Sequence, residues 1–119
     1  MKKVALIGVE THVYEVMKLN GDVLEIVAIS VPEEQKKIVE SKYNVPVFTD
    51  SNEMLDKIET DIVGIFNPHN ERANAVIESL LRNKNVIVDK PMAININELK
   101  RIKEILKKSK DMDILKMTK

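Results

Sequence analysis

The sequence contains no cysteine and only two histidines among its 119 residues. It therefore offers no disulfide framework and no thiolate that could hold a metal ion, and two histidines do not complete a zinc site by themselves. We expect any chemistry of this protein to be metal-free.

Neither sign of charge is in excess, because 19 lysine and arginine residues balance 19 aspartate and glutamate residues. Such a chain has no basic field that would attract nucleic acid, so we expect no nucleic-acid partner. Long apolar runs are missing as well. No segment approaches the roughly 20 apolar residues that span a bilayer, and MKKVALIGV lacks the cleavage site of a signal peptide. We therefore expect a cytoplasmic protein with no membrane partner.

What the sequence does contain is a regular alternation of short runs rich in valine and isoleucine with segments of helical periodicity. This pattern is typical of repeated β-α units around a parallel sheet, and the near-continuous hydrophobicity of the runs implies cover on both faces. The sequence predicts an α/β fold, a doubly wound parallel sheet of the Rossmann type with strand order 3-2-1-4-5, as a single three-layer domain over residues 1–119. The expected strands are 4–9, 24–31, 46–48, 61–66 and 85–89, with 113–117 as a candidate sixth.

The expected helices have recognisable starts and apolar stripes. Pro32 opens the second helix at a first-turn position, and Asp50 or Ser51 caps the third. Asn95, with Glu98 three residues later, resembles a capping box at the start of the fifth. The apolar side chains expected to face the sheet are Val13, Val16 and Met17, then Ile38 and Val39, then Ala73, Val76, Ile77, Leu80 and Leu81, and finally Leu99, Ile102, Ile105 and Leu106.

The stretch LIGVETHV, residues 6–13, looks like the end of a buried strand that runs into a phosphate-binding turn. Of the glycines in G-x-G-x-x-G only the first is present, as Gly8, and Glu10 and Val13 occupy the other two positions. The second glycine normally lets pyrophosphate approach bare backbone, whereas a carboxylate about 5 Å from a phosphate repels it by roughly 3 kcal/mol at an effective dielectric near 20. Thr11 and His12 could partly compensate by donating hydrogen bonds to a phosphate. The alternative for His12 is a solvated loop histidine.

Three stretches go beyond a generic α/β pattern: KYNVPVFTDSNEML (42–55), DIVGIFNPHNERANAVIESLLRNKNVIVDKP (61–91) and PMAININELKRI (91–102). Together they resemble the N-terminal domain of the Gfo/Idh/MocA oxidoreductases, the glucose-fructose oxidoreductase and inositol dehydrogenase family. Asp89-Lys90-Pro91 stands where that family has Glu-Lys-Pro. The resemblance covers about residues 2 to 110 and implies a Rossmann domain that binds NAD or NADP.

The resemblance also implies positions for the cofactor. Asn67, Pro68 and His69 match the family's Thr-Pro-Asn turn beside the nicotinamide-side ribose, and Lys90 matches the lysine most often tied to catalysis. Gly8, Thr11 and His12 would face the phosphates. A satisfied turn residue remains the alternative for His69, and a solvated lysine the alternative for Lys90.

The family's acidic residue at the end of the second strand is replaced by Val31. The resemblance gives that acid the role of binding the adenine ribose, so its loss removes a hydrogen bond worth roughly 1.5–3 kcal/mol. No arginine or lysine takes its place, so a preference for NADP is not supported. Glu33 could substitute if the turn were shifted, but an acid in a first helical turn is the simpler interpretation.

Family members are usually much longer, because a second domain supplies substrate contacts, and we expect that substrate domain to be absent from this chain. Two functions stay open. In the first, the chain is a stand-alone NAD(P)-binding-like domain with weak or absent cofactor binding and no dehydrogenase activity alone. In the second, it is the cofactor subunit of a split or oligomeric oxidoreductase, and a separate substrate-domain chain completes the enzyme. Apolar residues in the terminal DILKMTK further predict a homodimer with residues 113–117 in the contact.

Overall fold

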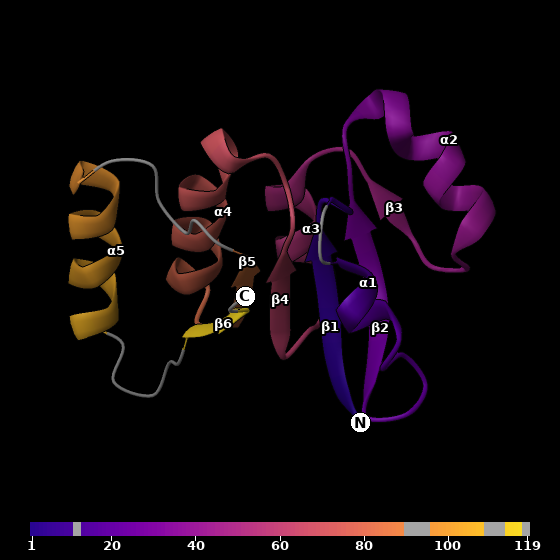
Figure 1. The fold of residues 1–119 in the computed structure, drawn as a ribbon, viewed down its shortest axis with the longest axis horizontal. Helices are drawn as coiled ribbons and strands as arrows, with labels where there is room; N and C mark the ends of the chain where they lie inside the picture. The colour runs from indigo at the N-terminus through magenta and orange to yellow at the C-terminus, as the bar shows by residue number, and fades with distance from the viewer. Residues whose placement is uncertain (11–12, 90–95, 109–113, 118–119) are drawn as a thin grey trace.

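The computed structural model describes residues 1–10, 13–89, 96–108 and 114–117, and it shows a parallel sheet between two layers of helices (Figure 1). The strands run in the order β3-β2-β1-β4-β5-β6. This confirms the doubly wound fold, the predicted order and the sixth strand. The strands are β1 (Lys2–Ile7), β2 (Leu24–Ser30), β3 (Val47–Phe48), β4 (Ile62–Ile65), β5 (Asn85–Asp89) and β6 (Ile114–Met117). The helices are α1 (Val13–Met17), α2 (Glu33–Lys42), α3 (Ser51–Lys57), α4 (His69–Leu81) and α5 (Ile96–Lys108).

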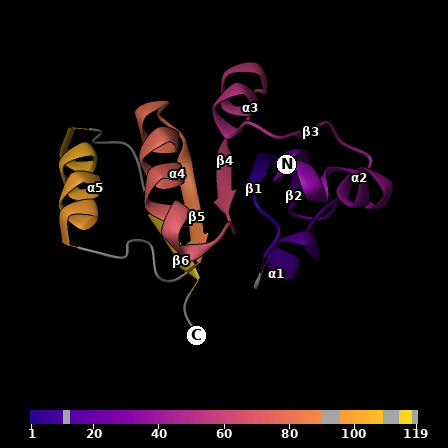
Figure 2. The ribbon, with the colours of Figure 1, turned by 90° about the horizontal axis from the view of Figure 1, so that it is seen from above.

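Alternate residues of β1 point into two different cores. Ala5 and Ile7 belong to the core that α3, α4 and α5 cover, whereas Val4 and Leu6 belong to the core beneath α1 and α2. Seen from above, the two groups of helices lie on opposite faces of the sheet (Figure 2). Burial on both faces explains why the strand sequences are apolar at nearly every position.

Two apolar residues depart from the predicted helix stripes. Ile38 and Leu81 are 59% and 56% exposed, while their neighbours Val39 and Leu80 are buried. A helix turns by about 100° per residue, so Ile38 and Leu81 lie at the edges of their stripes, rotated away from the sheet that Val39 and Leu80 face. The other predicted stripe residues whose side chains are described are buried or half-buried; those of Leu99 and Leu106 lie outside the described part.

Helix starts follow the predicted capping chemistry with one shift. Asp50 is the N-cap of α3, since its Oδ1 accepts hydrogen bonds from the backbone N–H groups of Asn52 at 3.0 Å and Glu53 at 3.3 Å. Pro32 is the N-cap of α2 rather than a first-turn residue. Because a proline has no N–H to lose, it suits either position. The capping box expected at Asn95 lies outside the described residues.

Candidate functional site

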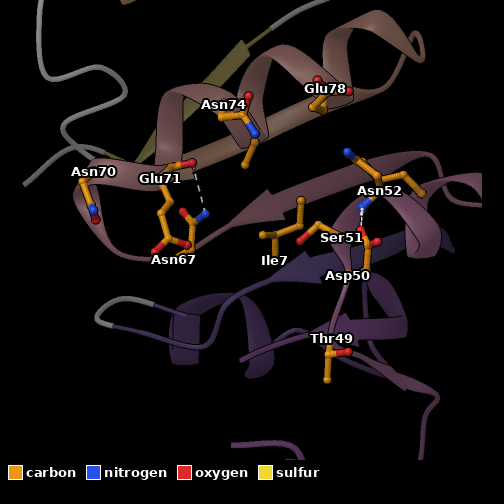
Figure 3. A pocket seen from close by; sticks show the side chains of 12 residues that line it. Ile7, Thr49, Asp50, Ser51, Asn52, Asn67, Asn70, Glu71, Asn74 and Glu78 are labelled. Carbon is orange, nitrogen blue, oxygen red and sulfur yellow. Dashed lines mark hydrogen bonds between the residues drawn. The ribbon is translucent and has the colours of Figure 1, made fainter. Parts of the chain in front are cut away.

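Two adjoining cavities, of about 310 and 500 Å³, open where the carboxyl ends of β1, β2, β3 and β4 meet. The strand order reverses at this place, which is where open α/β sheets bind ligands. We call the two cavities together the crevice. The larger one lies between the start of α3 and the polar side of α4 (Figure 3). Both are lined by Ile7, Thr49, Ser51, Asn67 and Glu71.

Gly8 brings the turn after β1 against the turn after β4. Its φ of +82° lies in the left-handed region, and a Cβ atom built there would lie 2.6 Å from the N and Cα atoms of Asn67 and from the Phe66 carbonyl oxygen. Two short backbone hydrogen bonds hold the turn: Gly8 N–H donates to the Ser30 carbonyl at 2.7 Å, and Glu10 N–H donates to the Phe66 carbonyl at 2.8 Å. The glycine is therefore required by the packing of the two turns, with or without a ligand.

Glu10 stands at the position of the second motif glycine and lines the smaller cavity. Its backbone N–H is already engaged by Phe66, so this position presents a carboxylate where a dinucleotide site presents bare backbone. Val13, at the third glycine position, is buried in the core beneath α1 and α2.

Val31, which the resemblance aligns with the family's ribose-binding acid, is 3% exposed and packs into the core with Val39 of α2. A buried aliphatic side chain offers no acceptor to a ribose. Its neighbour Ser30 directs its hydroxyl at that of Ser51, with 3.0 Å between the two oxygens. Glu33 is the first residue of α2, in the first-turn place that suits an acidic side chain.

The turn after β4 is held by a buried arginine. Arg72, 1% exposed, donates from Nε to the Asn67 carbonyl at 2.9 Å. Asn67 is itself only 7% exposed; its Nδ2 donates to the Glu71 carbonyl at 3.3 Å, and none of the described residues donates to its Oδ1. Leaving a buried acceptor unpaired costs roughly 1–3 kcal/mol, so a donor that reached this oxygen would be favoured.

Sequence reasoning did not find the polar side of α4. Asn70, Glu71, Asn74 and Glu78 line the larger cavity (Figure 3). The intervals of three residues from Glu71 to Asn74 and four from Asn74 to Glu78 are the signal that would have revealed a polar stripe opposite the apolar one. Glu78 is held by Arg82, whose Nη1 donates to it at 3.0 Å while Nε donates to Asp56 at 2.8 Å. These two carboxylates raise the pKa of the Arg82 guanidinium.

The structure brings three of the predicted site residues together at the crevice, namely Gly8, Asn67 and Pro68, and Pro68 is the N-cap of α4. His69 is the first residue of α4, but its side chain is outside the described part. The predictions for Thr11, His12 and Lys90 also fall outside the described residues.

Within the described ranges, no group of three or more histidine and acidic residues is arranged to hold a metal ion. None of the helices in the described part is long and apolar enough to cross a bilayer.

Comparison with known proteins gives a family and a fold. The sequence profile of the oxidoreductase family with an NAD-binding Rossmann fold, GFO_IDH_MocA, matches residues 2–116. No curated protein sequence matches the chain significantly.

Three solved structures illustrate the likeness. One is myo-inositol 2-dehydrogenase from Lactobacillus plantarum, with a TM-score of 0.85 and 18% identity over 98% of this chain. Another is scyllo-inositol dehydrogenase from Lactobacillus casei with bound NAD(H) and scyllo-inositol, with a TM-score of 0.84 and 15% identity over 97% of this chain. The third is the WlbA dehydrogenase from Bordetella pertussis in complex with NADH and UDP-GlcNAcA, with a TM-score of 0.84 and 19% identity over 97% of this chain. The chain spans only about a third of their length, since the match covers 36%, 35% and 36% of them.

Proposed function

Because the chain belongs to the oxidoreductase family with an NAD-binding Rossmann fold, we propose that it is a degenerate cofactor domain. It binds NAD(H) or NADP(H) weakly and transfers no hydride by itself. The observation that carries this proposal is the carboxylate of Glu10 on the wall of the smaller cavity, at the position where family members admit the pyrophosphate.

Two positions in the crevice support weak dinucleotide binding. Glu10 opposes a phosphate by roughly 3 kcal/mol if it stays about 5 Å away. Val31 withholds a hydrogen bond that a carboxylate would supply, worth roughly 1.5–3 kcal/mol. Since each 1.4 kcal/mol is tenfold in affinity, the two together weaken a micromolar site by about three to four orders of magnitude, to millimolar or beyond.

Calorimetric titration of NAD(H) and NADP(H) tests this proposal. We expect weak or undetectable binding to the unmodified chain and clearly tighter NAD binding after Glu10→Gly combined with Val31→Asp. Glu59→Gly is the matched control, because Glu59 carries the same charge on a loop and its side chain is 91% exposed. Micromolar NAD binding to the unmodified chain would show that Glu10 and Val31 weaken dinucleotide binding little.

A second candidate is the cofactor subunit of a split or oligomeric oxidoreductase. It is favoured by the family match, because the profile of an NAD-binding oxidoreductase family covers residues 2–116. Hydride transfer requires the substrate carbon to lie about 3–3.5 Å from the nicotinamide ring, so this function needs a substrate-binding surface beside the crevice. Oxidation of a sugar or polyol by the pure chain, followed by NADH absorbance and abolished by Lys90→Ala, would contradict the inactive reading and support an enzyme.

A further inference from the structure

We propose that α2 is a surface through which two copies of this chain pair weakly. In this pair the two α2 helices run antiparallel, and Ile38 of each copy enters a groove of the other. The proposal does not depend on cofactor binding. It is carried by an exposed apolar side chain, by the groove beside it, and by a charge order along α2 that is complementary to its own reverse.

The outer side of α2 carries one large apolar side chain between two charged ones. Val39 is 4% exposed and packs in the core, whereas Ile38 is 59% exposed. Glu34 and Lys42 lie one helical turn before and after Ile38 and are exposed as well. α2 lies at the opposite end of the molecule from α5 (Figures 1 and 2). A single exposed apolar residue is ordinary, so what makes Ile38 informative is its surroundings.

A groove of about 160 Å³ opens beside Ile38, between α2 and the start of α1. Four of its described lining residues come from α2: Gln35, Ile38, Val39 and Lys42. Its other described lining residues carry largely apolar surface: Val9, Val13 and Tyr43. The spacing of the four α2 residues is i, i+3, i+4 and i+7, which is the set that forms a hole for the side chain of a facing helix in knobs-into-holes packing. The groove has room for several water molecules, at roughly 30 Å³ each, which a branched aliphatic side chain would displace.

The charges on this side of α2 favour a second, antiparallel copy as the occupant. If a two-fold axis passes beside Ile38, each residue before it faces the residue equally far after it in the other copy. Glu34 then faces the partner's Lys42, and symmetry repeats this ion pair. Gln35 likewise faces the partner's Ser41, an amide opposite a hydroxyl. A parallel pair would instead place like charges side by side, which disfavours that arrangement.

These polar groups are available for such a pair. Glu34 and Lys42 form no ion pair or hydrogen bond with the residues that the structure describes. The Ser41 hydroxyl donates to the Ile38 carbonyl at 2.7 Å, so its oxygen can still accept a hydrogen bond from the amide of the partner's Gln35. The pair therefore gains contacts without breaking any that the described chain makes.

This pairing is weak and separate from the contact expected at residues 113–117. α2 packs beside β3, and β3 and β6 are the two opposite edges of the sheet. The face of a single short helix buries far less than the roughly 1,200–2,000 Å² of a stable interface, so the contact belongs to the small, transient class. We expect a dissociation constant on the order of 1 mM, so the pairing does not add to a mass measured at micromolar concentration.

Charge reversal followed by mixing tests the pairing. Glu34→Lys and Lys42→Glu each set like charges opposite one another, so each variant alone should pair about tenfold more weakly than the unmodified chain. A mixture of the two restores both ion pairs between unlike copies. The backbone amide signals of α2 in ¹⁵N-labelled Lys42→Glu, at about 0.5 mM, should therefore shift when unlabelled Glu34→Lys is added. These shifts should shrink as salt is raised.

Two additions serve as controls for the mixing experiment. Unlabelled Lys42→Glu added to its labelled copy should cause no shift, because the like charges persist. Glu40→Lys makes the same charge change as Glu34→Lys, but on the side of α2 turned away from Ile38. It should act no differently from the unmodified chain. A loss of helix stability in either charge variant would not be repaired by mixing, so recovery on mixing reports the contact itself.

Disulfide formation tests the antiparallel register, because the chain has no cysteine of its own. Gln35→Cys and Ser41→Cys chains, mixed in a glutathione redox buffer, should form the mixed disulfide faster than either chain forms a disulfide with itself. Only facing positions bring two Cα atoms within the roughly 4.4–6.8 Å that a disulfide needs. Mass spectrometry of the covalent dimers identifies which pair has formed.

Recovery of the α2 shifts on mixing, together with an excess of the mixed disulfide, supports the pairing. The absence of shifts on mixing, or shifts as large with Glu40→Lys as with Glu34→Lys, would overturn it. Faster self-disulfides than mixed ones would show that the copies do not meet in the antiparallel register, and this too would overturn the proposal.

Discussion

Gly8→Ala tests the close contact between the turn after β1 and the turn after β4, on which the crevice is built. An alanine at φ +82° adopts a left-handed conformation, which costs roughly 1–2 kcal/mol. Its Cβ would also lie 2.6 Å from three backbone atoms of Phe66 and Asn67, well inside the usual carbon contact distance of about 3.5–4.0 Å. Backbone atoms cannot swing aside as a side chain can, so the turn must shift.

The two contributions can be separated because the chain supplies a matched glycine. Gly21 has φ +86°, and a Cβ built on it has no other atom within 4 Å. Gly21→Ala therefore carries the conformational cost and the change in unfolded-chain entropy without the clash. Forcing an extra methyl group into a packed site typically costs about 1–3 kcal/mol. We expect Gly8→Ala to lose roughly 2–5 kcal/mol in total and to exceed Gly21→Ala by the packing part.

Urea unfolding, followed by circular dichroism, measures both variants against the unmodified chain. A loss of this size is a large fraction of the roughly 5–15 kcal/mol that stabilises an ordinary domain, so Gly8→Ala should unfold at clearly lower urea. Equal destabilisation by the two variants would mean that the turns do not approach as closely as described. The reasoning that assigns Gly8 to packing would then be refuted.

Three further predictions concern other parts of the chain. Asp50→Ala should destabilise the protein by about 1 kcal/mol through loss of the α3 cap, whereas Asn52→Ala, which removes no cap, should cost less in the same unfolding assay. Arg82 holds the pKa of the Asp56 carboxyl below its ordinary 3.8. Asp56→Asn should therefore be less stable than the unmodified chain at neutral pH, and this difference should vanish as the pH falls below about 4. A difference that does not change with pH would contradict this. We also propose a homodimer that forms through the outer edge of β6, because β5 is the only described strand beside β6. Light scattering should give the mass of a dimer, and deletion of residues 112–119 should reduce it to that of a monomer. A monomeric mass for the unmodified chain would contradict the proposal.

The fold could be predicted from the sequence because the pattern of apolar residues and the rules for connecting parallel strands together leave few possible arrangements. Near-continuous apolar runs require a sheet covered on both faces, and helical crossovers between parallel strands leave few possible orders. Side-chain direction on the helices was less predictable. Ile38 and Leu81 show that an apolar residue next to a buried one can point to solvent, and periodicity alone does not say which of the two will.

The candidate site was predictable where it depends on the ends of strands. Gly8 follows β1 directly, and Asn67 and Pro68 come within three residues of the end of β4, so the strand order was enough to bring them together. The polar side of α4 and the buried position of Arg72 depend on how α4 rotates against the sheet. That rotation is set by the packing of many side chains at once, which no short stretch of sequence contains.

The retained first glycine therefore says less about cofactor binding than its place in the motif suggests. In this fold the turn after β1 must pass the turn after β4, and a side chain at Gly8 would prevent it whatever the crevice holds. The second and third motif positions carry no such requirement: Glu10 reaches the cavity wall, and Val13 packs into the core. If folding were the only requirement, the chain would need a glycine at position 8 but not at positions 10 and 13, and this matches the sequence. Glu10 and Val31, rather than Gly8, are accordingly the positions at which dinucleotide binding in this chain should be tested.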